Sequence, residues 1–401
     1  MHVREIRPTD VGKNTPIYAV WEITLRCDHA CAHCGSRAAT ARPTELNLDE
    51  LIETADALIR MGTREVTLIG GEAYLSPHVY PLVKHLADAG LLVSMQTGGR
   101  GLTPERCEKL VEAGMAAIGV SVDGPEEVHD ILRAVKGSHA AALQAIDNAL
   151  AVGLPVTTNM QVNRLTMHTL RQHYEMLDAR RIRAWRCQLT VPMGRAADHP
   201  QWILQPFQIL EVLDTMAELQ HEAVRRNEER GLPAMHIMNV HPSNNLGYFG
   251  PHEELLRSRP GTRSSYWGGC PAGRYTIGIE SDGVVKACPS LPTAPYVGGN
   301  VKDRSLEDIW NNTDELAFVR NRTTEELWGF CKTCYYADTC RAGCAWTAHC
   351  TLGKRGNNPF CYHRAATLKK QGRRERLEVA ESAEGVPYDF GRMVIVEEDW
   401  R

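Results

Sequence analysis

Three cysteines stand close together near the start of the chain, directly after an apolar stretch. Residues 17–25 read IYAVWEITL, and the motif C-x3-C-x2-C follows with Cys27, Cys31 and Cys34. Thiolates at such spacing hold zinc or an iron–sulfur cluster. Structural zinc sites are normally closed by four protein ligands, and only His29 and His33, inside the loop, are available to complete a mixed zinc site. A [4Fe–4S] cluster also needs four ligands, so three cysteines would leave one iron open to a small molecule.

The composition fits a soluble enzyme with one large core and a smaller domain. The chain has 401 residues, a formal charge of −4 and 43% hydrophobic residues. We expect no nucleic-acid partner, because no basic excess is present. We expect no membrane partner either, because no apolar run reaches the roughly 20 residues that a membrane helix needs. The N-terminus lacks the apolar stretch of a signal peptide, which predicts a cytoplasmic protein. In the cytoplasm, 13 cysteines favour metal binding or catalysis over disulfides.

Short apolar segments alternate with amphipathic ones along the first half of the chain. The predicted strands are 17–25, 65–71, 91–99, 116–124, 155–163 and 182–190. The predicted helices include 48–62, 102–114 and 138–153, each of which ends at a glycine. This alternation predicts an α/β fold with a parallel sheet of six βα units. A partial (β/α)6 TIM-like barrel suits that number, and a doubly wound open sheet is the alternative. In both, ligands gather at the carboxyl ends of the strands.

Polar residues follow two of these strands. The segment GGE, made of Gly70, Gly71 and Glu72, follows the second strand, and its glycines would let the backbone approach a ligand closely. The alternative is a strand-to-helix turn with a capping glutamate. Ser121 and Asp123 alternate at the end of the fourth strand and so point the same way, which suits a hydroxyl and a carboxylate that meet one ligand.

Three further polar residues are weaker candidates. Asn159 and Gln161 form a second same-facing pair at the end of the fifth strand, and Arg133 could meet a ligand's carboxylate. The alternative for all three is a solvated position at a loop end.

The cysteine motif after a strand, the GGE segment and the S-x-D-G segment resemble the radical S-adenosylmethionine (SAM) superfamily. The resemblance implies that SAM chelates the open iron, that GGE receives its amino group, and that Ser121, Asp123 and Arg133 contact it. The chain departs from the family pattern at Ala73, where proline is usual, and at His33, where an aromatic residue commonly precedes the third cysteine. Cluster binding should survive both departures, although surroundings tune a cluster's potential.

A second group of cysteines crowds the last third of the chain. Eight fall within 92 residues: Cys270, Cys288, Cys331, Cys334, Cys340, Cys344, Cys350 and Cys361. A zinc ribbon would show two CxxC pairs, whereas this region has one and too many partners. Together with Gly283 and the glycine-rich segment 296–301, the string resembles the SPASM domain, an extension of radical SAM enzymes that carries two auxiliary iron–sulfur clusters.

The resemblance also implies how these ligands are shared, because the two sets interleave in the family. The first auxiliary cluster would take Cys270, Cys288 and Cys344. The second would take Cys331, Cys334, Cys340 and Cys361. The missing ligand of the first is Cys350, another side chain, or none, and the sequence leaves these alternatives open. Cys107 and Cys187 lie outside both motifs and are expected to be structural.

The predicted organisation has five parts. A lead-in covers 1–16, the radical SAM core 17–200, a bridging helix and loop 201–261, the SPASM domain 262–365 and a C-terminal tail 366–401. The tail is charged and carries no cofactor motif.

The resemblance implies reductive cleavage of SAM to a 5′-deoxyadenosyl radical that abstracts hydrogen from a substrate. SPASM enzymes typically mature ribosomally made peptides, which predicts crosslinking, oxidation or epimerisation of a peptide or protein. The implied partners are an electron donor such as flavodoxin or ferredoxin and a separate peptide-recognition protein. No catalytic acid, base or radical-quenching residue is identified.

Three alternatives stay open. One is a radical SAM dehydrogenase that acts on a small molecule. A sulfatase-type maturase is disfavoured, because the family's catalytic Asp after the auxiliary-cluster cysteine is replaced by Pro289, which follows Cys288. The non-enzymatic alternative is an iron–sulfur or zinc scaffold, which would leave the GGE and S-x-D-G segments unexplained.

Overall fold

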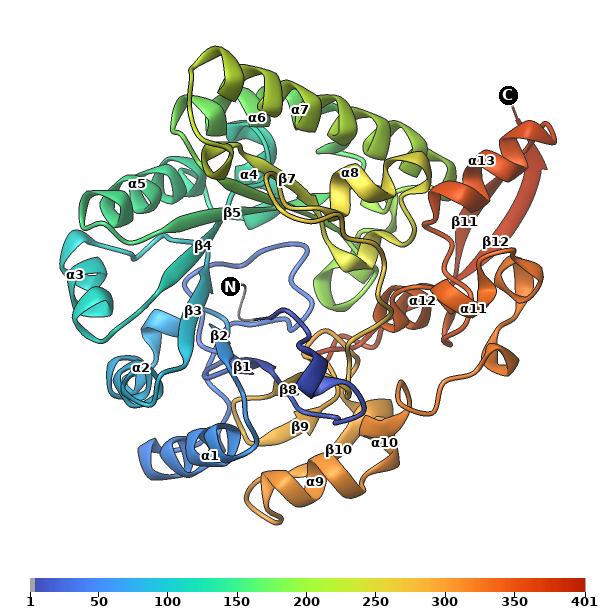
Figure 1. The fold of residues 1–401 in the computed structure, drawn as a ribbon. Coiled ribbons are helices and arrows are strands. Elements are labelled where there is room, and N and C mark those ends of the chain that lie inside the picture. Colours follow the sequence, from blue (N-terminus) through green and yellow to red (C-terminus); the bar gives the residue numbers. More distant parts are fainter. Residues whose placement is uncertain (1–3, 401) are drawn as a thin grey trace.

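Strands from both halves of the chain join in one curved sheet. In the computed structural model, which describes residues 4–400, the strand order is β10-β9-β8-β1-β2-β3-β4-β5-β6-β7. The first six strands are β1 Tyr18–Glu22, β2 Glu65–Ile69, β3 Leu92–Thr97, β4 Ala117–Ser121, β5 Val156–Val162 and β6 Ala184–Leu189. Adjacent members pair in parallel. Strands and helices alternate around the centre of the view in Figure 1, with the helices outside, so the predicted partial barrel is confirmed.

The parallel part of the sheet is longer than the six predicted strands. β7, Asn239–Pro242, pairs in parallel with β6, and β8, Thr276–Ile279, pairs in parallel with β1. Both strands have four residues, and β7 ends in a proline, which is tolerated at a sheet edge. Neither strand carries the longer apolar pattern that marks the first six. The residues expected to bridge the two domains therefore contribute a strand to the barrel.

A capping residue and several glycines mark the ends of the barrel helices. They are α1 Leu48–Arg60, α2 Val79–Asp88, α3 Pro104–Glu112, α4 Glu126–Arg133, α5 Ser138–Ala151, α6 Leu170–Ala179 and α7 Ile209–Glu229. Asn47 caps α1, since its side chain accepts from Glu50 N at 3.1 Å while Glu50 Oε2 accepts from Asn47 N at 2.8 Å. The glycines after α1, α3 and α5 have φ of +84°, +94° and +76°, the left-handed conformation that terminates helices.

The barrel strands alternate between an apolar outer face and a polar inner one. In β5 the outer side chains Thr158 and Met160 are buried while Asn159 and Gln161 are half-buried, and β6 shows the same alternation. Cys107 and Cys187 are fully buried in the apolar core, as expected. The space inside the strands is therefore lined by polar side chains.

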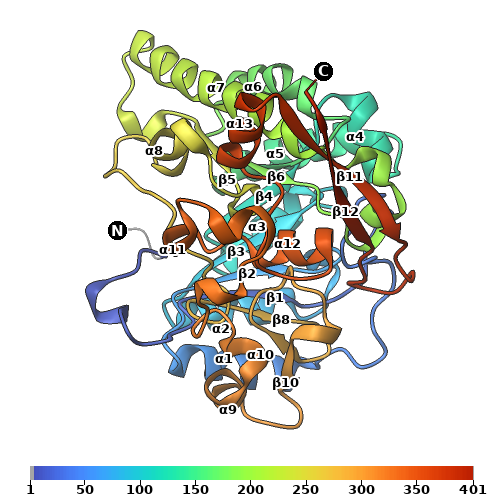
Figure 2. The same ribbon diagram turned by 90° about the vertical axis from the view of Figure 1, so that its right-hand side faces the viewer.

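The cysteine-rich region is built from short elements. β9, Val284–Lys286, and β10, Val297–Asn300, extend the sheet antiparallel beyond β8, with Gly283 at φ +92° in the turn. The helices are α8 Glu253–Arg257, α9 Leu306–Asn312, α10 Asp314–Ala317, α11 Ala337–Cys340, α12 Ala345–Leu352 and α13 Tyr362–Lys370. In Figure 2 the orange and red helices α9 to α13 lie on the side of the molecule that faces the viewer.

The tail after residue 366 is ordered, which its charged composition did not indicate. It completes α13 and forms the hairpin β11, Arg373–Glu381, and β12, Arg392–Asp399. The hairpin loop reaches back to the start of the barrel, where Asp389 accepts from Arg37 Nε at 2.8 Å and its carbonyl accepts from Gly194 N at 2.8 Å. No helix among residues 4–400 is both long and apolar enough to cross a membrane.

Tyr388, in the same loop, enters a buried network of charges. Its hydroxyl donates to the Glu22 carboxylate, which also pairs with Arg42 at 2.7 Å. Arg42 continues to Glu280 at 3.0 Å, and Glu280 pairs with Lys286 at 2.6 Å. The two carboxylates thus balance the two cations, as buried charges require.

We expect Tyr388→Phe to lower the stability by about 1–3 kcal/mol, because the buried Glu22 loses a hydrogen-bond donor. The thermal midpoint of the anaerobically purified protein measures the change. Val386→Ala, at a half-exposed position in the same loop, is the control. Equal shifts for the two variants would show that the hydroxyl contributes nothing.

Candidate functional site

The first three cysteines lie in the loop after β1, at the carboxyl edge of the sheet. Arg195, from the loop after β6, holds this loop: its Nε donates to Cys31 O at 2.7 Å and its backbone N to Cys34 O at 2.9 Å. The preceding Gly194 has φ +57°, and a Cβ there would lie 2.3 Å from Cys34 O. The motif loop is therefore held in place by the far end of the barrel.

The GGE segment after β2 lies directly against the motif loop. Gly71 N donates to Thr24 O and Glu72 N to Arg26 O, both at 2.8 Å. A Cβ at Gly71 would lie 2.3 Å from Arg26 O and 2.7 Å from Cys27 Cβ. Only glycine fits at this close approach of two backbones, which is the physical reason for the pattern.

Glu72 is buried next to the first cysteine. Its carboxylate accepts from Thr97 Oγ1 and from Gly98 N, each at 2.6 Å, and His29 Nδ1 lies 3.8 Å away. Burial raises the pKa of Glu72 to about 7, although these two donors act in the opposite direction. A cationic partner would stabilise the ionised form of a carboxylate buried in this way, and the ammonium group of an amino acid is such a cation.

The cysteines themselves are mutually close. Burial raises the pKa of Cys27 to about 12, and the nearby Glu72, Cys31 and Cys34 add to the rise. Burial also raises the pKa of Cys31 to about 11, against the effect of Arg133. Burial and mutual repulsion thus disfavour the thiolates, and a bound metal or cluster would stabilise them and displace their protons.

A mixed donor set exists in the same loop. Ligand atoms of Cys27, Asp28, His29 and Glu72 lie within 4.8 Å of one another. His29 Nδ1 is 2.9 Å from Asp28 Oδ1, so this imidazole nitrogen already has a hydrogen-bond partner in the Asp28 carboxylate. The mixed zinc alternative thus has donors in reach, but it would use only one of the three cysteines.

Asp123 and Arg133 form an ion pair next to the loop of the first three cysteines. Asp123 is fully buried, its Oδ2 accepts from Arg133 Nε at 2.8 Å, and its Oδ1 accepts from Gln161 N at 2.8 Å. Arg133 Nη1 also donates to Cys31 Sγ at 3.8 Å. Burial works to raise the pKa of Asp123, but Arg133, then His33 and His129, hold it at about 2. Both residues therefore position the loop of Cys31, and their direct contact with a ligand stays a prediction.

His33 takes part in this arrangement. Its Nδ1 lies 3.1 Å from Leu132 O and its Nε2 3.6 Å from Asp123 Oδ2. Burial lowers the pKa of His33 to about 4, so the imidazole is neutral at neutral pH. His33, which stands where the family commonly has an aromatic residue, therefore connects the loop of the first three cysteines to Asp123 at the end of β4.

The remaining predicted residues lie inside the barrel. Ser121 and Asn159 are register partners on β4 and β5, and Asn159 Nδ2 donates to Gln96 Oε1 on β3. The Gln96 side chain crosses β4 where Gly119 leaves room, since a Cβ at Gly119 would lie 2.1 Å from Gln96 Oε1. Gln161 Oε1 accepts from Thr190 Oγ1 at 3.5 Å. These amides face one space inside the barrel.

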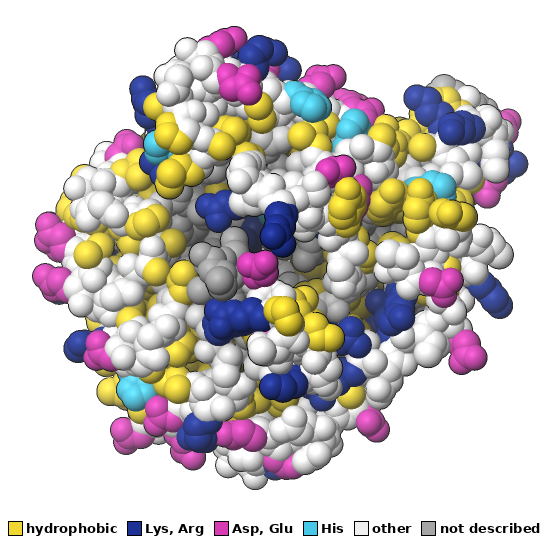
Figure 3. All heavy atoms as spheres, viewed as in Figure 1, with side chains coloured by type: hydrophobic (Ala, Val, Ile, Leu, Met, Phe, Trp, Pro, Cys, Tyr) yellow, Lys and Arg dark blue, Asp and Glu magenta, His cyan; other side chains and the backbone are white. Residues whose placement is uncertain are grey.

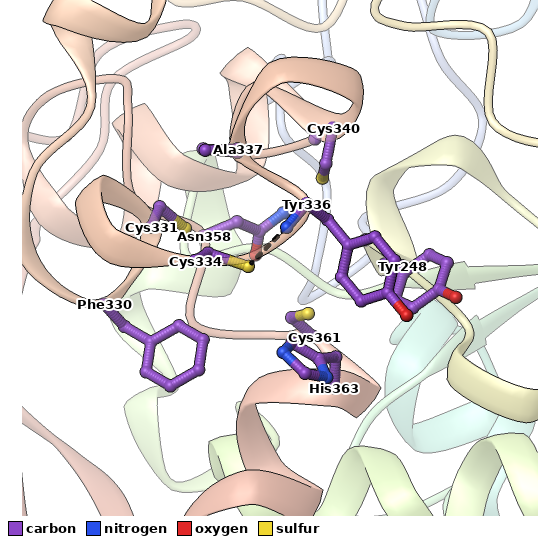
Figure 4. A pocket seen from close by; sticks show the side chains of 13 residues that line it. Tyr248, Phe330, Cys331, Cys334, Tyr336, Ala337, Cys340, Asn358, Cys361 and His363 are labelled. Carbon is purple, nitrogen blue, oxygen red and sulfur yellow. Dashed lines mark hydrogen bonds between the residues drawn. The ribbon is translucent and has the colours of Figure 1, made fainter.

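Four cysteines of the last third line a single pocket. They are Cys331, Cys334, Cys340 and Cys361, the four assigned to the second auxiliary cluster. Tyr248, Tyr336, Phe330 and His363 complete its wall, and Figure 4 shows the sulfur atoms of Cys334, Cys340 and Cys361 around a common space. Burial, then Cys361, Cys331 and Cys334, raise the pKa of Cys340 to about 12. Donor set and space both fit a cluster.

Three other cysteines gather where β9 ends and α12 begins. Burial, then Cys270 and Cys344, raise the pKa of Cys288 to about 12. Cys350 lies fully buried on α12, and of the other three thiols only Cys344 raises its pKa further. Cys270, Cys288 and Cys344 therefore form one group, with Cys350 at its edge beside Cys344.

The sequence did not single out the residues that join these centres. Trp346, two residues after Cys344, donates its Nε1 to Met193 Sδ at 3.1 Å, and Met193 lies next to Gly35 in the first cysteine loop. Arg186, on the inner face of β6 beside Asn159, was also passed over. Side chains alternate along a strand, so Arg186 is expected to point away from the face of the buried Cys187, and this was the signal that could have found it. No local sequence pattern marks Met193, Gly194 or Arg195.

Two family models match separate parts of the chain. Residues 21–177 match the family model described as the radical SAM superfamily, and residues 270–335 match that of an iron–sulfur cluster-binding domain, SPASM.

Several known proteins are similar over nearly the whole chain. The AdoMet-dependent heme synthase of Methanosarcina barkeri is 28% identical over 355 residues, which cover 88% of this chain and 97% of that protein. Mycofactocin maturase MftC of Mycobacterium tuberculosis is 28% identical over 363 residues, which cover 89% and 86%. The structure of native anSMEcpe with bound AdoMet shares the fold, with a TM-score of 0.65, 16% identity and coverage of 88% and 95%.

Replacing Cys27, Cys31 and Cys34 together with alanine should remove about four irons from each anaerobically purified chain. The iron of the cysteine-rich region should remain, because that pocket shares no side chain with the first loop. Iron and acid-labile sulfide analysis measures this. The matched control is Cys107→Ala in the apolar core. An unchanged iron content in the triple variant would contradict the assignment.

Proposed function

We propose that this chain, which belongs to the radical SAM superfamily and carries a C-terminal SPASM domain, modifies a ribosomally made peptide by crosslinking, oxidation or epimerisation. The observation that carries the proposal is the pairing of the SPASM cysteine set with a peptide-maturase relative similar over 89% of the chain. Radical SAM and SPASM domains bind [4Fe–4S] clusters and SAM, so these are the cofactors.

In the proposed assignment, Cys27, Cys31 and Cys34 hold the cluster that SAM completes. The donor chemistry supports this, since three soft thiolates suit iron–sulfur clusters. When bound, the cluster and SAM supply a 5′-deoxyadenosyl radical that can take a hydrogen atom from an unactivated carbon. Glu72 would receive the ammonium group of SAM, which fits a buried carboxylate with its pKa raised to about 7.

The chain's own residues hold the reacting groups in place. Arg133 brings a positive charge to Cys31, and Asp123 keeps the guanidinium oriented. Gly71 lets the GGE backbone lie against Cys27. Polar side chains on the inner faces of β3, β5 and β6 would orient the substrate beside SAM.

The auxiliary centres would accept an electron from the substrate or deliver one to the first cluster. We assign Cys331, Cys334, Cys340 and Cys361 to one centre and Cys270, Cys288 and Cys344 to the other, with Cys350 beside Cys344. Tyr335, next to the first of these groups, is 89% exposed, so this centre lies near the surface. A reduced flavodoxin or ferredoxin in the cytoplasm would be the partner there, and a separate protein would present the peptide.

A second candidate function has its own support. Two of the proteins cited above differ in substrate class, and the heme synthase aligns along 97% of its length. The inner faces of the strands carry amides, a hydroxyl and an arginine, groups that would serve a small acidic molecule as well as a peptide. Oxidation of a small molecule is therefore the rival activity.

Co-expression of the enzyme with short peptides encoded beside its gene, in heavy water, separates these activities. We expect a peptide to lose two hydrogens, gain an oxygen or acquire deuterium, as seen by mass spectrometry. The Cys27→Ala/Cys31→Ala/Cys34→Ala variant is the control and should leave the peptide unchanged. Unmodified peptides beside active SAM cleavage by the wild type would contradict peptide maturation and favour the small-molecule activity.

A further inference from the structure

An arginine inside the barrel has no partner in the described chain. Arg186 lies on the inner face of β6, in register with Asn159 of β5 and His241 of β7. Among residues 4–400, no hydrogen bond or ion pair includes its guanidinium group. By contrast, neighbouring charged groups do have partners: Arg4 pairs with Glu65, and Arg4 Nε lies 2.6 Å from Glu65 Oε2.

The surroundings leave this positive charge uncompensated. Burial, then Arg186 and Arg257, lower the pKa of His241 to about 3, so His241 is neutral. Glu65 is the carboxylate that acts on Arg186, and Arg4 already engages it. Arg186 is half-buried, and an arginine stays protonated at any physiological pH. Its guanidinium group is therefore available to an anion that enters the barrel.

Strand register places Arg186 inside the barrel, below the loop of the first three cysteines. Asp123 accepts from the backbone of Gln161, and Gln161 is in register with Gln188 of β6. Arg186 comes two residues before Gln188 and so points the same way, about 6–7 Å further from the carboxyl edge of the sheet. A substrate placed below SAM would meet the guanidinium. The face drawn in Figure 3 carries arginine or lysine side chains near its centre.

We propose that Arg186 binds a carboxylate of the substrate inside the barrel. The guanidinium fork matches a carboxylate in two parallel hydrogen bonds, and the amide of Asn159 beside it supplies a polar neighbour. The proposal deepens the proposed function, on which it rests, because it names the group by which the substrate is held. That carboxylate could be the C-terminus of a peptide or an acidic group of a small molecule, which share one chemistry.

Chemical protection of the wild-type holoenzyme tests this without a variant. Phenylglyoxal labels arginine, and mass spectrometry of the digested protein follows Arg186 and the exposed Arg183 separately. The probes are N-acetyl-dialanine, its C-terminal amide, and Fe-coproporphyrin III as a small molecule with several carboxylates, each with SAM present. We expect one of the acids to slow the labelling of Arg186 about tenfold at saturation, with Arg183 unaffected. Protection by the dipeptide acid indicates a peptide terminus, and protection by the porphyrin alone indicates a small acid.

Two results would overturn the proposal: equal protection by the amide, or no protection by either acid. Binding of the protecting acid to three variants gives the second measurement. Arg186→Gln should raise Kd by about tenfold or more, Arg186→Lys by less, and the control Arg183→Gln should leave it unchanged. Equal Kd values for Arg186→Gln and the wild type would also refute it.

Failure of the proposed function looks different. A wild-type holoenzyme that forms no 5′-deoxyadenosine with dithionite would contradict the radical SAM activity. An unprotected Arg186 in an enzyme that cleaves SAM would contradict only the carboxylate site.

Discussion

The buried ion pair between Asp123 and Arg133 connects the parts of the molecule on which the chemistry depends. Asp123 follows β4, Arg133 ends α4, and the pair reaches Cys31 on one side and the backbone of β5 on the other. Breaking a buried pair of this kind leaves a charge without a partner and costs about 3–5 kcal/mol. The position of the first cysteine loop relative to the sheet therefore depends on this pair.

A second set of constraints joins the two cysteine regions. Arg195 and Gly194, after β6, hold the first loop, and Met193 beside them meets Trp346 of α12. The C-terminal hairpin closes the same junction, with Asp389 on Arg37 and Tyr388 on Glu22. Electron transfer and radical chemistry both need centres at fixed separations, and these contacts provide the fixed geometry. The described part of the tail thus helps to hold this junction together.

Much of the fold could be predicted from the spacing of apolar residues and from the glycines that end the helices. The first six strands and the helices between them lie within a few residues of their predicted bounds, because glycines end the helices and apolar runs mark strands buried on one side. β7 and β8 were missed because four residues give too little pattern. The β11–β12 hairpin was missed because its strands are charged and largely exposed, so that pairing with each other, rather than burial, stabilises them.

By itself, the sequence determined the residue types and spacings that the chemistry needs: three cysteines after a strand, two glycines before Glu72, and the cysteine string of the last third. These are local features, and the close approach of Gly71 to Cys27 shows why a local pattern can carry a site. Only the tertiary structure decided which side chains are free. Asp123 and Arg133 form an ion pair with each other, whereas Arg186, on the last of the six predicted strands, has no ion-pair partner among residues 4–400. The reason is physical, since charge compensation depends on distance in space, and residues on different strands of a partial barrel come together only after the sheet has formed and curved.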